Sequence, residues 1–481
     1  MGIPDWISEA VFYQIFPDRF RRGGQAGLPQ PADHFEDWEG PPTIRGFKGG
    51  SLWGVAEKLD YLVSLGFNAI YLNPIFASSA NHRYHTSDYL RVDPLLGGDA
   101  ALQNLLNEAH RRGVKVILDG VFNHSGRGFF AFNHLLENGP ASPYSDWYYV
   151  KGYPLRAYSA KPNYAAWWDN PELPKLRIET PEVRNYLLAV AEHWIRFGAD
   201  GWRLDVPEEI SDMEFWREFR RRVKDANPQA YIVGEIWHEA ADWVGEDGPF
   251  DGVMNYPLGR AILAYVGGKD FDYQLAASSG LGRFAPLDGR SWLERVAELL
   301  HIYQGPTAMA QLNLLGSHDT PRLFTMMRQS ATKTALALEL LFTLPGAPSV
   351  YYGDEIALAG GHDPDNRRAF PWDEAKWRKD VQSRLRRAAS LRREHAALRL
   401  GEFSGRWGEG GRAAFRRVQD SEELLVIVNA SPEEWKIELP CDSQDEFWRS
   451  LSSKASLSCA SGSLRGELMQ PFSLLIFSAR R

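Results

Sequence analysis

The stretch GADGWRLDVPEE (198–209) contains a short strand with an unusual charged face. Side chains alternate along an extended strand, so Arg203 and Asp205 share one face while the apolar residues around them share the other. A charged pair would then point to where a core is expected. Two interpretations are open at this point: a buried structural ion pair, or a carboxylate nucleophile that its neighbour keeps ionised.

Eight short apolar runs recur along the chain, separated by stretches with the spacing of amphipathic helices. Helical spacing is clearest at 100–113 and at 181–198, where Thr180 is the expected N-cap and Pro181 the first helical residue. Strands that alternate with helices predict a parallel sheet, and eight of them predict an α/β protein with a (β/α)8 TIM barrel. The expected strands lie within 10–16, 68–74, 115–121, 201–206, 230–236, 251–256, 312–318 and 347–353.

Two segments fall outside this repeat. The gap between the third and fourth strands is too long for one helix and its loops, which predicts a small inserted subdomain at 125–175. Strand-like alternation follows the last barrel helix, which is expected within 377–395, and predicts a carboxy-terminal β-sandwich domain at 397–481. The catalytic barrel is therefore expected to comprise residues 1–124 and 176–396.

Composition argues against several classes of function. The 481 residues carry a formal net charge of -8, which disfavours a nucleic-acid partner because such proteins usually present a basic face. No apolar run reaches membrane-spanning length and the amino terminus lacks the pattern of a signal peptide, so we expect a cytoplasmic protein with no membrane partner. The two cysteines, Cys441 and Cys459, are expected to be free thiols rather than a bridge.

Polar and charged residues gather at the carboxyl ends of the expected strands, where barrel enzymes build their active sites. The opposite strand ends show no comparable set. This placement favours the functional interpretation of the charged pair in 201–206 over the structural one. The set comprises Asp119 with Asn123 and His124, Arg203 with Asp205, Glu235 with Trp237, and His318 with Asp319.

The acids in this set suit the hydrolysis of an acetal, since one carboxylate can attack the sugar carbon while another protonates the leaving oxygen. Arg203 should favour the ionised form of Asp205, whereas Glu235, flanked by apolar residues, should be desolvated and stay protonated. Asp319 would place negative charge beside a developing oxocarbenium ion, and His124 could bind sugar hydroxyls, as could His318. A strand-end acid can equally cap a helix or bind a cation.

The competing chemistry is that of a metal-dependent barrel hydrolase, which uses histidine and aspartate from several strand ends. The end of the first strand reads QIFPDRF and contains no His-x-His pair. We therefore predict no catalytic metal.

Four stretches at these positions resemble the shared regions of the α-amylase family, glycoside hydrolase family 13, and the resemblance covers nearly the whole chain. It implies that Asp205 is the nucleophile, Glu235 the general acid/base and Asp319 the stabiliser of the transition state, with retention of anomeric configuration. It also implies that Arg203, His124 and His318 surround the sugar before the cleaved bond. The four stretches are DGVFNH (119–124), GWRLDVPEE (201–209), GEIW (234–237) and LLGSHD (314–319).

Further stretches are similar to the neopullulanase, cyclomaltodextrinase and maltogenic amylase group of that family. The similarity implies that Tyr84 stacks on the glucose at the cleavage site and that Trp237 lines the next subsite. It also implies that Asp363 and Arg367 border the pocket, from the loop DPDNRRAFPW (363–372). The other stretches are NHRYHTSDY (81–89), LPKL (173–176), GEIWHEA (234–240) and FDGVMNYP (250–257).

The sequence departs from that group at two places. Many members carry an amino-terminal β domain before the barrel, whereas here the first strand begins near Ala10, so we do not expect that domain, and either a monomer or a homodimer is compatible. Pro207 and Glu208 replace the Ala-Asn more usual after Val206, close to the acceptor side. The family's calcium-binding asparagine would map to Asn123, but we see no acidic cluster to pair with it and predict no required cofactor.

The expected function is hydrolysis of α-1,4 glucosidic bonds, with some α-1,6 cleavage, in maltooligosaccharides, cyclodextrins or pullulan. The reaction would pass through a covalent glucosyl-enzyme intermediate and include transfer to sugar acceptors. A glucosyltransferase or trehalose-forming isomerase of the same family is the alternative, since it would use the same intermediate. A third hypothesis is a non-catalytic barrel that only binds glucan or serves as a protein scaffold, but such proteins commonly lose the three acids that are present here.

Overall fold

Eight parallel strands form the centre of the protein, in a computed structural model that describes residues 2–24, 34–245, 248–441, 443, 446–452 and 456–479. Each strand lies inside one of the predicted apolar runs. A strand of a parallel sheet is buried on both faces, and its sequence is therefore a nearly continuous apolar run. In sheet order the strands are β8 (Gly252–Val253), β7 (Tyr231–Gly234), β6 (Gly201–Leu204), β5 (Lys115–Gly120), β2 (Ala69–Leu72), β1 (Phe12–Ile15), β10 (Ala347–Tyr351) and β9 (Leu312–Leu314).

The sheet closes on itself between its two outer strands, β8 and β9. A single parallel bridge between Met254 and Leu312 joins them, and the Asn255 amide N–H donates to the Leu312 carbonyl at 2.8 Å. Amide side chains supply the remaining bonds: Val253 N–H donates to Gln311 Oε1, and Asn255 Nδ2 donates to Asn313 Oδ1, each at 3.0 Å. The predicted TIM barrel is confirmed, with a seam in which side chains replace part of the strand ladder.

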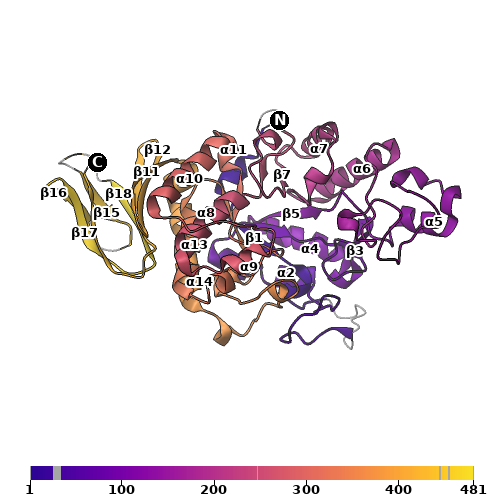
Figure 1. The fold of residues 1–481 in the computed structure, drawn as a ribbon, viewed down its shortest axis with the longest axis horizontal. Coiled ribbons are helices and arrows are strands. Elements are labelled where there is room, and N and C mark those ends of the chain that lie inside the picture. The colour runs from indigo at the N-terminus through magenta and orange to yellow at the C-terminus, as the bar shows by residue number, and fades with distance from the viewer. Residues whose placement is uncertain are drawn as a thin grey trace.

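Helices cover the outside of this barrel (Figure 1). The predicted helices at 100–113, 181–198 and 377–395 correspond to α4, α6 and α14. Helix α6 begins at Pro181 as predicted, but the Thr180 hydroxyl donates to the Asp146 carbonyl and does not cap the helix. The longer helices are α2 (Leu52–Glu57), α3 (Leu59–Leu65), α4 (Gly98–Arg111), α6 (Pro181–Phe197), α7 (Met213–Ala226), α8 (Tyr256–Gly267), α10 (Gly289–Ile302), α13 (Ala331–Thr343) and α14 (Lys379–Glu394). The short ones are α1 (Pro17–Phe20), α9 (Tyr273–Ala277), α11 (Pro306–Met309), α12 (Leu323–Met326) and α15 (Ala396–Leu400).

Two excursions from the strand and helix repeat extend the rim of the barrel. The hairpin of β3 (Phe76–Ser78) and β4 (Thr86–Val92) follows β2, and residues 79–85 connect its two strands. The segment between β5 and α6 contains α5 (Phe130–Asn138) and folds back onto the barrel through antiparallel bridges such as His124 with Lys175 and Ala166 with Pro174. The proposed subdomain boundaries at 125 and 175 stay a prediction.

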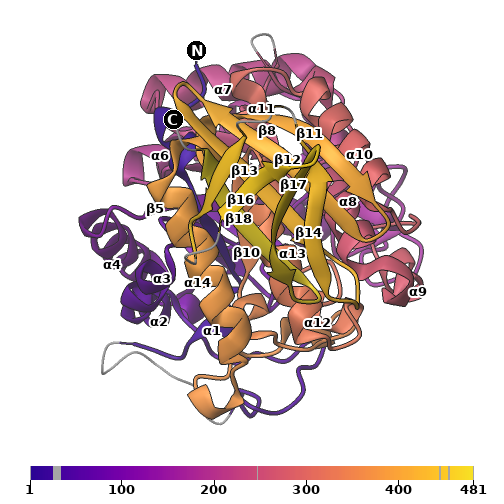
Figure 2. The ribbon, with the colours of Figure 1, turned by 90° about the vertical axis from the view of Figure 1, so that its left-hand side faces the viewer.

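The carboxy-terminal strands form one antiparallel sheet that packs against the barrel helices (Figure 2). Trp407 and Trp435 on its two edge strands stack with centroids 5.5 Å apart, so the sheet folds around a core that includes Leu425 and Phe477. On the other side Phe415 packs on Trp292 of α10. In sheet order the strands are β11 (Glu402–Glu409), β12 (Arg412–Gln419), β13 (Glu422–Asn429), β18 (Ser473–Ala479), β15 (Phe447–Ser450), β16 (Ser456–Ala460), β17 (Ser463–Met469) and β14 (Trp435–Pro440).

The expectation of free thiols is wrong, because Cys441 and Cys459 form a disulfide. Strand β17 lies between β14 and β16, so Pro440 pairs with Ser463 while Cys459 pairs with Leu464. This register brings the two Cα atoms within 5.9 Å of each other, a separation typical of a bridge. Spacing along the chain gave no sign of that register.

Among the described helices, none combines the length and the apolar character that a bilayer crossing requires.

Candidate active site

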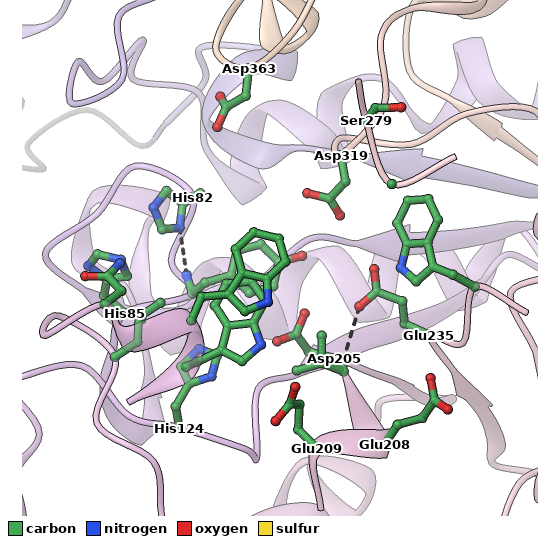
Figure 3. Close-up of a pocket in the computed structure, with 18 of the residues that line it drawn as sticks. His82, His85, His124, Asp205, Glu208, Glu209, Glu235, Ser279, Asp319 and Asp363 are labelled. Carbon is green, nitrogen blue, oxygen red and sulfur yellow. Dashed lines mark hydrogen bonds between the residues drawn. The ribbon is translucent and has the colours of Figure 1, made fainter. Parts of the chain in front are cut away.

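The carboxyl ends of the barrel strands open into a cavity of about 890 Å³ (Figure 3). Two of the predicted site residues, Arg203 and His318, are fully buried directly behind its wall. The structure therefore brings all ten predicted residues to one site. The eight that line the cavity are Tyr84, His124, Asp205, Glu235, Trp237, Asp319, Asp363 and Arg367.

One guanidinium, that of Arg203, contacts three acids at the base of the cavity. Its Nη1 lies 2.8 Å from Asp119 Oδ1 and 3.0 Å from Asp205 Oδ1, and its Nη2 lies 2.8 Å from Glu235 Oε1. The strand register explains this arrangement, since Arg203 of β6 is the neighbour of Asp119 on β5. Asp205 and Glu235 are therefore held on the two outer nitrogens of one side chain.

The end of β6 has a left-handed residue, Val206, with φ of 35°. A β-branched residue rarely adopts this backbone, and such strain is typical of functional sites. The turn directs the Val206 N–H at Glu235 Oε2, 3.2 Å away, as the dashed line in Figure 3 shows. The Val206 N–H thus contacts one oxygen of the Glu235 carboxyl group, and the Arg203 guanidinium contacts the other.

Burial controls the protonation of these acids. It raises the pKa of Glu235 to about 7, although the Arg203 guanidinium opposes the shift. Burial also raises the pKa of Asp205 well above its usual range, again against Arg203, and nearby Glu235 adds to the rise. Arg203 favours the ionised form of Asp205, as predicted, but desolvation has the larger effect on the pKa of Asp205. Because the two carboxyl groups are close, they titrate as a pair.

A third acid, Asp319, faces the same space from the end of β9 (Figure 3). Arg367 Nη2 lies 3.3 Å from Asp319 Oδ1, and Arg367 Nη1 lies 3.1 Å from Asp363 Oδ2. Burial raises the pKa of Asp319, and Arg367 opposes that shift. The predicted loop after β10 therefore supplies a cation that positions Asp319.

Behind the acids, a chain of hydrogen bonds orients Tyr84 and His318. The Gln14 amide donates to His318 Nδ1 at 3.0 Å, and His318 Nε2 lies 2.6 Å from the Tyr84 hydroxyl, which donates to Asp119 Oδ2 at 2.9 Å. With Nδ1 accepting, Nε2 carries the proton. The two rings are nearly parallel, 5.4 Å apart.

Sequence reasoning missed the supporting members of this network. Gln14 and Asn73, at the ends of the first two barrel strands, bond each other at 3.1 Å, and Asn73 Nδ2 donates to the Tyr84 hydroxyl at 3.2 Å. The available signal was a polar side chain within an otherwise apolar strand. Asp119 was recognised at a strand end, but its bond to Arg203 was not.

Aromatic rings form two sides of the cavity. On one side His124 stacks on Trp167, and Trp167 on Trp168. Burial lowers the pKa of His124 to about 3, so its imidazole is neutral. On the other side Trp237 stacks on Tyr256 with centroids 3.6 Å apart. The indole pair Trp167 and Trp168 was not among the predicted site residues.

Asn123, the position to which the family's calcium ligand would map, is buried beside His124. Its Nδ2 lies 3.2 Å from His124 Nδ1. Among the described residues, no group of three or more histidine, cysteine, aspartate or glutamate side chains is arranged to hold a metal ion.

Comparison with known proteins places this site in a family context. The model for the α-amylase catalytic domain matches residues 14–399, and that for a neopullulanase-like C-terminal domain matches residues 407–478. A cyclomaltodextrinase of Geobacillus thermopakistaniensis is 40% identical over 92% of this chain and 72% of its own length.

Two solved structures match almost the full length of this chain. Ttha1563 of Thermus thermophilus superposes with a TM-score of 0.95 at 57% identity, covering 99% of this chain and 100% of its own. A debranching enzyme of Nostoc punctiforme superposes with a TM-score of 0.88 at 41% identity, covering 99% of both chains.

Proposed function

The chain belongs to the α-amylase family, glycoside hydrolase family 13, and from that membership we propose that it is a retaining hydrolase of α-glucans. The substrates we propose are maltooligosaccharides, cyclodextrins or pullulan, cleaved at α-1,4 and, to a lesser extent, α-1,6 bonds. The cyclodextrin-cleaving name of one relative and the debranching name of a solved structure support this range.

One observation carries the proposal: Asp205 and Glu235 contact the same Arg203 guanidinium, through Nη1 and Nη2. Retaining glycosidases keep their two carboxyl groups about 5 to 5.5 Å apart, whereas inverting enzymes separate them further to admit a water molecule. Two groups on one guanidinium are close neighbours. The arrangement therefore favours direct attack by a carboxylate over attack by water.

Burial raises the pKa of both acids, so near neutral pH the pair shares a proton, and the two roles follow when Glu235 holds that proton and Asp205 is ionised. With a pKa of about 7, Glu235 holds a proton near neutral pH and donates it to the glycosidic oxygen, which leaves as the hydroxyl of the departing glucan. The Asp205 carboxylate attacks the anomeric carbon and forms an ester, while Arg203 stabilises its charge before attack. The Glu235 carboxylate then takes a proton from water, whose oxygen attacks the anomeric carbon and releases Asp205.

Asp319 and Tyr84 act on the sugar itself in this proposal. The Asp319 carboxylate, held by Arg367, faces the positive charge that develops on the ring. Tyr84 presents its ring to the cavity, with the hydroxyl fixed by Asp119 and His318. A sugar hydroxyl in place of water at the second step gives transfer products.

Digestion of β-cyclodextrin, pullulan, starch and maltotriose by the wild type and by Asp205→Ala tests the proposal. We expect hydrolysis by the wild type and a loss of roughly a thousandfold or more in the variant. Proton NMR of the first products should show the α-anomer. A β-anomer, or activity retained in Asp205→Ala, contradicts the assignment, and mainly transfer or isomeric products would favour the glucosyltransferase alternative.

A further inference from the structure

An indole ring stands exposed at the rim of the cavity. Trp168 is 82% exposed, the largest value among the bulky apolar side chains in the described part of the chain, yet it lines the same cavity as the catalytic acids. An apolar ring this large gains free energy when it is covered. An exposed indole beside this cavity is therefore a candidate contact for a bound ligand.

The backbone of the turn that carries Trp168 is unfavourable for such a residue. Trp168 has φ of 51° and Asp169 has φ of 55°, both in the left-handed region where glycine is preferred. Backbone hydrogen bonds hold the turn: Trp167 N–H donates to the Leu173 carbonyl at 3.0 Å, and Asn170 N–H donates to the Trp167 carbonyl at 2.9 Å. A strained conformation that surrounding bonds maintain is characteristic of binding and catalytic positions.

A stack of rings connects this exposed indole to the catalytic end of the cavity. The Trp168 and Trp167 rings lie 4.5 Å apart at an angle of 10°, and Trp167 lies 5.6 Å from His124. His124 lines the cavity together with Asp205. Trp167 therefore packs on one face of Trp168, and the exposed surface of Trp168 lies away from that stack.

We propose that Trp168 is a binding platform for a glucose unit of an α-glucan that extends from the cavity beyond the units held at the acids. The apolar C–H face of a glucose ring packs on a flat indole, and a rigid aromatic ring loses little conformational entropy on binding. Asn170 and Glu209, which line the same cavity, provide polar groups for its hydroxyls. This inference rests on the proposed α-glucan hydrolase function and adds a preference for longer chains.

The same segment offers a matched control, Tyr158. It is 80% exposed, and the Arg127 guanidinium lies over one face of its ring, 4.5 Å from the ring centroid. Tyr158 is not among the residues that line the cavity. Its replacement removes a similar exposed aromatic surface without touching the proposed platform.

The kinetic test compares maltoheptaose with maltotriose for Trp168→Ala, Trp168→Phe and Tyr158→Ala. We expect Trp168→Ala to lower kcat/KM for maltoheptaose about tenfold relative to that for maltotriose, the scale of an aromatic contact of about 1.4 kcal/mol. Trp168→Phe should retain most of the preference, and Tyr158→Ala all of it. An unchanged ratio in Trp168→Ala overturns the inference.

Measurements of thermal stability and of glucan binding distinguish a binding role for Trp168 from a structural one. Trp168→Gly relieves the left-handed backbone, so its thermal midpoint should stay near that of the wild type; a large fall, with equal losses on both substrates, would identify a structural role instead. Titration calorimetry of Asp205→Ala with maltoheptaose should show binding that weakens about tenfold when Trp168→Ala is added. If the wild type cleaves neither sugar, the proposed function fails, while this titration still tests the platform.

Discussion

His238 holds the carboxylate of Glu208 at the edge of the active-site cavity, with Nε2 of the histidine 2.7 Å from Oε1 of the glutamate. Glu208 lines the cavity on the side of Glu235 (Figure 3). It is also a position where the sequence departs from the pattern usual in its group. Pro207, the other departure, is buried, and its carbonyl accepts a bond from the Trp216 indole at 3.2 Å. Of the two, Glu208 is the one that can contact a substrate.

Replacement of Glu208 should alter the choice of bond and acceptor. Glu208→Gln keeps the shape of the side chain but removes a charge-assisted hydrogen bond, so we expect about a tenfold change in the ratio of α-1,6 to α-1,4 products from pullulan. Product analysis by chromatography measures this ratio. Glu374→Gln is the comparison, because the native Glu374 carboxylate also pairs with a cation, Lys379 at 2.8 Å, but does not line the cavity. Equal effects in both variants would contradict a specific role for Glu208.

The activity of the enzyme should fall as the pH rises through about 7. Glu235 must be protonated to act as the acid, and burial raises its pKa to about 7, so raising the pH removes the required proton. The profile of kcat/KM against pH for maltotriose measures the ionisation in the free enzyme. Glu235→Gln should lose roughly a thousandfold or more in activity. A profile that stays flat between pH 6 and 8 would argue against Glu235 as the acid.

A second buried carboxyl group, that of Glu355, should make stability depend on pH. It accepts bonds from the Tyr13 hydroxyl at 2.7 Å, the Tyr61 hydroxyl at 2.8 Å and the Gly353 N–H at 2.7 Å. Burial raises its pKa from the ordinary 4.5 to about 7. The folded state therefore holds this proton more tightly than the unfolded state does.

The sign of the effect follows from that shift. The contribution of Glu355 is complete below pH 4.5 and is lost as the pH rises through about 7, which amounts to on the order of 3 kcal/mol of unfolding free energy. Urea unfolding between pH 5 and 8 measures it. Glu355→Gln should lower stability but flatten this slope, whereas Glu137→Gln, at an exposed position, should leave the slope unchanged. A slope unchanged in Glu355→Gln would contradict the prediction.

Reduction of the disulfide should destabilise the carboxy-terminal sheet. Cys441 and Cys459 are separated by 18 residues, and closing a loop of this size contributes about 3 kcal/mol. We expect a lower thermal midpoint with a reductant and in the variant with both cysteines replaced by serine, measured by circular dichroism. The reductant should not change the midpoint of that double variant. Equal midpoints for the oxidised and reduced wild type would show that the bridge contributes nothing.

The sequence predicts the barrel well because its strands are buried on both faces and appear as apolar runs. The predicted site residues also meet at one place, since strand ends in a closed barrel converge. The contact between Arg203 and Glu235 was beyond prediction, because it depends on the packing of side chains from neighbouring strands. The exposed position of Trp168 depends on a left-handed turn that its residues do not favour, and the disulfide depends on the register of β16 and β17.

The seam between β8 and β9 gives the barrel a preferred place to open. Strand β8 spans only Gly252–Val253, and one backbone bridge joins Met254 to Leu312. Amide side chains such as Gln311 and Asn255 make the other bonds across the seam, and each contributes one such bond rather than a ladder. Amide protons of 252–255 should therefore exchange with solvent through local openings of lower free energy than those of β5 or β6. Local opening of the barrel would then begin at β8 and β9 and leave β6, which carries Arg203, paired with a strand on each side.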